Sequence, residues 1–144
     1  MEIEGGYLSP YFVTDPARSE ARLDDPYFLL VRDRLTSIRA LLGVLEAVAK
    51  SGRPLLVVAD DVEGEALATL VINKTRGSLR CCAVRVTGSR AGSDAIDDLA
   101  AITGAAVVSE EGDIKTLSLK DLGGAARAIV TADRTTIIGG ALLN

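Results

Sequence analysis

A group of acidic side chains follows directly after the apolar run 55–59: Asp60, Asp61, Glu63 and Glu65. Carboxylates at the C-terminal end of a strand are where α/β enzymes place ligands and hard metal ions, so Asp60, Asp61 and Glu63 suggest a metal-dependent hydrolase. Acidic side chains are also common at helix N-termini, where they accept hydrogen bonds from unpaired backbone N–H groups and interact favourably with the helix dipole. We find no second group of carboxylates and no general base elsewhere in the chain. We therefore favour a structural interpretation and keep the hydrolase as the alternative.

Other residues that commonly carry chemistry are scarce. The chain has no histidine, which excludes Ser/His and Cys/His catalysis and removes the commonest transition-metal ligand. Cys81 and Cys82 are adjacent in the apolar run 79–86, where a disulfide between them would need a strained turn, so we expect two reduced, buried thiols. Residues 88–92, Gly-Ser-Arg-Ala-Gly, lack the Lys-Ser/Thr of a phosphate-binding P-loop and predict a plain loop. We expect no catalytic residue, no metal and no cofactor in this chain.

The composition is that of a globular protein. With 144 residues, 48% of them hydrophobic, and a formal charge of −4, the chain fits one domain with one core. A pI near 4.8 with scattered Lys and Arg disfavours nucleic acid as a partner. The first residues are acidic where a signal peptide would be basic, and no apolar run approaches the ~18 residues of a membrane span. We expect a cytoplasmic protein.

Strand and helix patterns alternate along the chain after a turn-rich opening segment. The order is β-α-β-α-β-α-β, with strands over 27–31, 55–59, 79–86 and 105–108 and helices over about 36–50, 62–76 and 93–102. Thr36 or Ser37 can cap the first helix, and Asp60 with Glu63 has the spacing of a capping box for the second. Runs 128–131 and 135–138 predict a hairpin, preceded by a helical turn at 119–122. Because the apolar runs do not alternate, they predict an α/β fold with a central, mostly parallel sheet flanked by helices.

The second helix has two apolar stripes where a surface helix normally has one. At about 100° per residue, Val62, Ala66 and Leu70 share one arc, which is wide enough to pack on a core. The second arc lies across a charged border and contains Leu67, Ala68, Val71 and Ile72.

The first helix also carries more apolar surface than one sheet would cover. Its apolar arc spans roughly 220°, about twice the usual width, and places Leu42 and Leu45 on an uncovered shoulder. Tyr7, Tyr11 and Phe12 lie in the opening segment, where we expect them to be exposed as well. An apolar patch rimmed by charge is typical of a polypeptide-binding site, and two such helices side by side predict a groove between them. The alternative is a purely structural module, with both helices buried in a core or in an oligomer interface.

Several motifs in this chain resemble the apical domain of a group I chaperonin of the GroEL type. They are GYLSPYF at 6–12, LEAVAK at 45–50, PLL at 54–56, DVEGEALATLV at 61–71, Asn73, Arg76–Gly77, Thr103–Gly104, VSEE at 108–111, DLG at 121–123 and TTII at 135–138. The resemblance implies a three-layer β/β/α fold, a single polypeptide-binding domain over 1–144 without the equatorial and intermediate domains, and capture of non-native polypeptides and of the mobile loop of a GroES-type co-chaperonin.

The resemblance also implies specific site residues. The polypeptide-binding and co-chaperonin-binding residues would be Tyr7, Tyr11, Phe12, Leu42, Leu45, Leu67, Val71, Ile72 and Asn73. Arg53, Asp60 and Glu63 would form ion pairs between subunits of a homo-oligomeric ring, whereas the fragment alone would be monomeric. ATP and Mg²⁺ would bind only in the full-length parent, because the equatorial signature Asp-Gly-Thr-Thr-Thr is missing here.

The chain departs from the family pattern at three places. TGSRAGSD at 87–94 replaces the usual PGFGDRRK, Gly43 replaces a proline in the first helix, and Cys81–Cys82 stand where small aliphatic residues are usual. These differences indicate a divergent paralogue.

Overall fold

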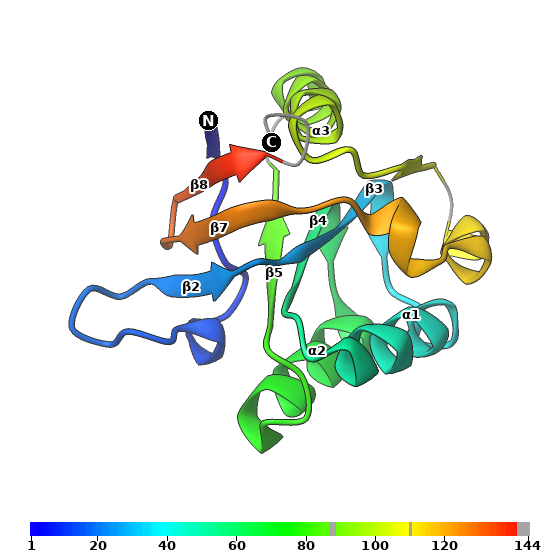
Figure 1. The fold of residues 1–144 in the computed structure, drawn as a ribbon, viewed down its shortest axis with the longest axis horizontal. Coiled ribbons are helices and arrows are strands. Elements are labelled where there is room, and N and C mark those ends of the chain that lie inside the picture. Colours follow the sequence, from blue (N-terminus) through cyan, green and yellow to red (C-terminus); the bar gives the residue numbers. More distant parts are fainter. Residues whose placement is uncertain (87–88, 110, 141–144) are drawn as a thin grey trace.

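The computed structural model shows an α/β protein. It describes residues 1–86, 89–109 and 111–140, and within these ranges only the backbone is described for residues 89–94 and 111–112. Within these ranges three α-helices accompany one four-stranded parallel sheet and one four-stranded antiparallel sheet (Figure 1). The predicted α/β class and the predicted parallel sheet are confirmed.

The parallel sheet contains β3 (Tyr27–Leu35), β4 (Leu55–Val62), β5 (Cys81–Arg85) and β6 (Val107–Val108), in the order β5-β4-β3-β6. Its strands are connected by α1 (Ile38–Ser51), α2 (Gly64–Arg76) and α3 (Ser89–Thr103). Residues 55–59 of β4 are all 0% exposed although neighbouring side chains point to opposite faces, so both faces of the sheet are covered. Cys81 and Cys82 are free, buried thiols of β5, as predicted.

The antiparallel sheet contains β1 (Glu2–Glu4), β2 (Ala21–Asp24), β7 (Ala125–Val130) and β8 (Arg134–Gly140), in the order β1-β8-β7-β2. The β7–β8 pair confirms the predicted hairpin. Burial alternates along β2, where Ala21 and Leu23 are buried and Arg22 and Asp24 are exposed, so this sheet packs one face on the single hydrophobic core. Strands β1 and β2 are not predicted by the sequence pattern, because both are short and lie among turn residues.

The opening segment joins the two sheets. The N–H of Gly5 donates to the carbonyl oxygen of Asp133 at 3.0 Å, and the N–H of Leu8 donates to that of Ala83 in β5 at 3.0 Å. A Cβ atom at Gly5 would overlap the carbonyl oxygen of Arg85, and one at Gly6 would overlap the β7–β8 turn. These two positions therefore require glycine for the close approach of three backbone segments.

Short 3-10 helices complete the fold: η1 (Pro10–Phe12), η2 (Glu111–Thr116) and η3 (Leu119–Leu122). The last of these confirms the predicted helical turn at 119–122. No helix in the described ranges is both long enough and apolar enough to cross a lipid bilayer.

Two predictions of local structure are wrong. The second helix begins at Gly64 because β4 continues to Val62, so Asp60 and Asp61 are strand residues and Glu63 occupies the N-cap position. The capping box of Asp60 and Glu63 is therefore absent. Helix α3 begins at Ser89, so Ser89–Gly92 form the start of a helix and not the predicted plain loop, whereas residues 87–88 lie outside the described part of the chain.

Candidate functional site

Helices α1 and α2 lie next to each other. Helix α1 connects β3 to the neighbouring strand β4, and α2 connects β4 to the next strand, β5. Because both connections are right-handed crossovers that move across the sheet in the same direction, both helices lie on the same face of the sheet. The two helices contact each other, whereas α3 returns across the sheet to β6 and contacts β3 and β4 (Figure 1). The outward sides of α1 and α2 thus form one continuous surface.

Helix α1 buries most of its apolar arc. Ala40, Leu41, Val44, Leu45 and Val48 are all buried, and Leu42 is 51% exposed. The expectation that Leu45 is an exposed shoulder residue is wrong, since its side chain is only 6% exposed. The physical reason is that Leu45 lies between Leu41 and Val48 on the helix surface, and both of these are buried. Leu42 alone of the predicted pair is available to a partner.

Helix α2 has the two predicted arcs. Val62 before the helix, Ala66 and Leu70 are buried, as expected for the core arc. On the other arc Leu67 and Val71 are half-buried, and Ile72 is 47% exposed. Asn73, also predicted as a binding residue, is half-buried, and its Nδ2 donates to the carbonyl oxygen of Thr69 at 2.8 Å.

The aromatic residues of the opening segment divide between surface and core. Tyr11 in η1 is 65% exposed, and Tyr7 is half-buried with its hydroxyl donating to the carbonyl oxygen of Ser19 at 3.1 Å. Phe12 is 0% exposed, so the expectation that it contacts a partner is wrong. The 3-10 turn of η1 directs neighbouring side chains to different sides, and the side chain of Phe12 packs into the core.

Exposed apolar side chains gather on these elements. Among the described residues the exposed large hydrophobic side chains are those of Tyr11, Leu42, Ile72 and Ile138. Three of them lie on η1, α1 and α2, and α2 contacts both of the other elements. These three residues and the half-buried Leu67 and Val71 of α2 define what we call the contact surface: Tyr11, Leu42, Leu67, Val71 and Ile72.

The acidic residues at the C-terminal end of β4 do not form a metal site in the described part of the chain. Partial burial and, to a smaller extent, the neighbouring carboxylate of Asp33 raise the pKa of Asp60, and Arg32 opposes this shift. Asp61 Oδ1 accepts from the backbone N–H of Val62 at 2.9 Å. Within the described ranges no three acidic, Cys or His side chains are placed to hold a metal ion. The geometry thus gives the hydrolase alternative no support.

Two of the three residues expected to pair between subunits have partners within the chain. Glu63 Oε1 lies 3.5 Å from Arg34 Nη1. Arg53 Nη2 lies 3.3 Å from Asp25 Oδ1, and its guanidinium lies 3.7 Å from the centre of the Tyr27 ring. Both ion pairs are partly exposed and contribute little stability on their own.

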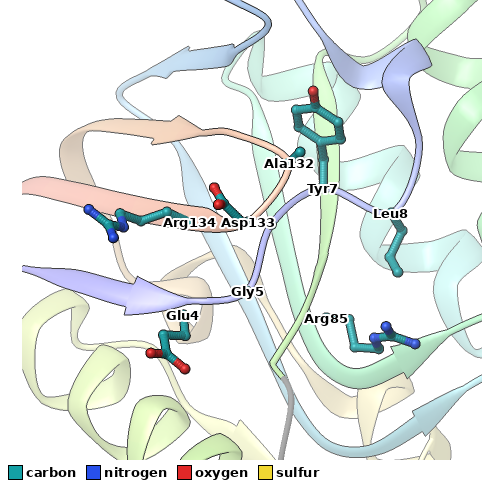
Figure 2. Close-up of a pocket in the computed structure, with 9 residues that line it drawn as sticks. Glu4, Gly5, Tyr7, Leu8, Arg85, Ala132, Asp133 and Arg134 are labelled. Atoms are coloured by element: carbon teal, nitrogen blue, oxygen red, sulfur yellow. The ribbon is translucent and has the colours of Figure 1, made fainter.

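A pocket that the sequence does not predict lies beside the opening segment. It has a volume of about 430 Å³ and is lined by Glu4, Gly5, Gly6, Tyr7, Leu8, Arg85, Ala132, Asp133 and Arg134 (Figure 2). Figure 2 shows the charged side chains of Glu4, Arg85 and Arg134 pointing away from one another, so they do not converge on a common ligand position. No local pattern could have predicted it, because its walls come from three segments distant in the sequence.

Comparison of the chain with models of known protein families finds no match.

Proposed function

We propose that this chain binds polypeptide segments at the contact surface of η1, α1 and α2. The observation that carries the proposal is the gathering of Tyr11, Leu42 and Ile72 on three adjoining elements, with 65%, 51% and 47% of their surfaces exposed. Large apolar side chains that are contiguous and exposed favour association with another apolar surface.

The binding would be non-covalent and driven by exclusion of water. Burial of apolar surface contributes ~25 cal/mol per Å², and the cost of ordering a flexible segment offsets much of this. One contact surface would therefore bind a segment weakly. Several copies in a ring would bind one client firmly through avidity.

The resemblance of the motifs to a GroEL-type apical domain supports the same function. The two sheets and the two neighbouring helices are compatible with the three-layer β/β/α arrangement that the resemblance implies. On this basis the partners are non-native polypeptides and the mobile loop of a GroES-type co-chaperonin, and the chain acts within a homo-oligomeric ring. Buried Phe12 and Leu45 take no part in the contact as the structure stands.

The proposal is tested by one charge substitution and its matched control. Ile72→Glu on α2 and Ile138→Glu on β8 change residues of equal type and nearly equal exposure, 47% and 45%. A fluorescently labelled apolar peptide is titrated with each variant, and circular dichroism verifies the fold. Ile72→Glu is expected to weaken binding by at least about tenfold, since a carboxylate would have to be buried against apolar side chains, and Ile138→Glu is expected to leave it unchanged. Equal affinities of both variants and the unaltered chain would overturn the proposal.

A further inference from the structure

Building on the proposed function, we propose that the preferred polypeptide segments carry acidic side chains next to their apolar residues. The acidic side chains would be received where α1 and α2 end, by two arginines that we call the basic end: Arg76 and Arg80. The contact surface would hold the apolar part of the same segment.

The C-terminal ends of α1 and α2 lie side by side. Both helices return from the C-terminal to the N-terminal edge of the parallel sheet, so they run in the same direction. A pocket of about 200 Å³ between their ends is lined by residues that follow each helix, among them Gly52, Gly77 and Arg80. Arg80 Nη2 donates to the carbonyl oxygen of Gly52 at 2.7 Å, which holds the two ends together.

Positive charge is in excess at this place. Lys50 lies 3.6 Å from Glu46, and nearby Arg53 lies 3.3 Å from Asp25, so each of these cations has an acidic partner. Arg76 and Arg80 make no ion pair within the described part of the chain. Lys74 is not counted with them, because its Nζ donates to the carbonyl oxygen of Val13 at 3.4 Å and Lys74 lies on the other side of α2 from Arg76.

The helix dipoles do not cancel this excess. Each helix C-terminus carries about half a negative charge, so the two helix ends together offset about one of the two cations. A net positive charge of about one remains for a partner.

The basic end continues the contact surface. Ile72 and Arg76 are four residues apart on α2 and therefore neighbours on its surface. On α1 the exposed Ala49 follows Leu42 by two turns on the same side and also lines the pocket. Four helical residues rise by about 6 Å, the length of about two residues of an extended chain. An acidic side chain about two residues beyond the last apolar contact would thus reach Arg76.

The opposite end of the contact surface has no such excess. Near the first turns of the two helices, Arg39 and Glu65 carry opposite charges, and Arg34 pairs with Glu63 at 3.5 Å. Because the excess positive charge lies at one end of the two helices, we expect the acidic side chains of a bound segment to lie at that end.

Three synthetic peptides with the same apolar core, flanked on both sides by Glu, by Gln or by Lys, test the inference. At an ionic strength of about 0.02 M we expect the Glu-flanked peptide to bind about three- to tenfold more tightly than the Gln-flanked one, and the Lys-flanked peptide to bind least tightly. At about 0.5 M salt the difference should fall below about twofold, because exposed charges are then screened.

Variants assign this preference to the basic end. The double variant Arg76→Gln/Arg80→Gln, with its fold verified by circular dichroism, should lose most of the advantage of the Glu-flanked peptide. Arg134→Gln on β8, an exposed arginine on the antiparallel sheet, serves as the control and should retain the advantage. Equal binding of the Glu-flanked and Gln-flanked peptides at low salt, or an advantage that survives in the double variant, would overturn the inference and leave the proposed function standing. Failure of all three peptides to bind would instead overturn the proposed function, and the inference with it.

Discussion

Leu70 and Ile72 lie two positions apart on α2 and face opposite sides of the helix: Leu70 is 0% exposed and Ile72 is 47% exposed. The side chain of Leu70 packs into the core, and the main-chain carbonyl of the same residue accepts from Cys81 Sγ at 3.3 Å. Ile72 belongs to the contact surface. One face of α2 thus packs on the core and the other belongs to the contact surface, and substitutions can change one face without the other.

The first prediction concerns this separation. Leu70→Ala should lower the free energy of unfolding by about 2–5 kcal/mol, because it leaves a cavity in the core. Ile72→Ala should lower it by less than about 1 kcal/mol, because the side chain is half exposed, yet it should weaken peptide binding. Urea unfolding and peptide titration of both variants measure the two effects. Similar losses of stability in the two variants would contradict the assignment of the two faces.

Glycine positions provide the second prediction. Gly43 lies on the exposed side of α1, and a Cβ atom there would have no neighbour within 4 Å. Gly43→Ala should therefore raise the free energy of unfolding by about 0.5–1 kcal/mol, since alanine is the better helix former. Gly6→Ala, the contrasting variant, should destabilise the chain, because its Cβ would overlap the backbone of the β7–β8 turn. Urea unfolding of the two variants should give changes of opposite sign, and stabilisation by both would refute the close approach at Gly6.

The buried thiols provide the third prediction. Burial raises the pKa of Cys81 from 9.0 to about 12, and the nearby Lys74 opposes the shift. Burial raises the pKa of Cys82 further still, with a smaller contribution from Cys81. The folded chain therefore holds these protons at a pH where the unfolded chain has released them, and their contribution to stability, complete below pH 9, is lost as the pH rises toward 12.

Each thiol should thus lower the free energy of unfolding by up to ~1.4 kcal/mol per pH unit above pH 9. The variant Cys81→Ala/Cys82→Ala should show a shallower decline than the unaltered chain when urea unfolding is followed between pH 8 and about 10.5. Parallel declines in the two proteins would contradict the burial of the thiols.

The sequence predicts the fold where the signal is local. The apolar runs 27–31 and 55–59 are long and uninterrupted, and both are strands of the parallel sheet. Strands β1 and β2 escape prediction because they have only 3 and 4 residues, and their strand conformation depends on pairing with β8 and β7 far along the chain. Local propensity carries no information about such distant partners.

The candidate site is predictable in part for the same reason. A helical wheel identifies Ile72 and Leu42 as outward residues, because the periodicity of a helix is fixed by its geometry. It fails for Leu45, whose burial depends on elements that pack beside α1, and α1 contacts η2 and η3 from distant parts of the sequence. For Phe12 in a short 3-10 turn there is no periodicity to interpret.

The acidic residues at the C-terminal end of β4 provide the fourth prediction. Neighbouring residues on a strand point to opposite faces, so Asp60 and Asp61 cannot chelate one ion without rearrangement of β4. Millimolar Mg²⁺ or Mn²⁺ should therefore leave the Tm of the chain unchanged, because an ion that does not bind the folded state cannot stabilise it. A rise in Tm that disappears in the variant Asp60→Asn/Asp61→Asn would instead favour the metal-dependent hydrolase.

The most direct test of the central claim is a titration of the isotope-labelled chain with an apolar, strand-forming peptide, followed by amide chemical shifts. The proposal predicts saturable shifts concentrated at Tyr11, Leu42, Leu67, Val71 and Ile72 and at their neighbours on α1 and α2, with little change in β1, β2, β7 and β8. Shifts centred on the antiparallel sheet or on the pocket beside Gly5 and Gly6, or no shifts at all, would contradict the proposal.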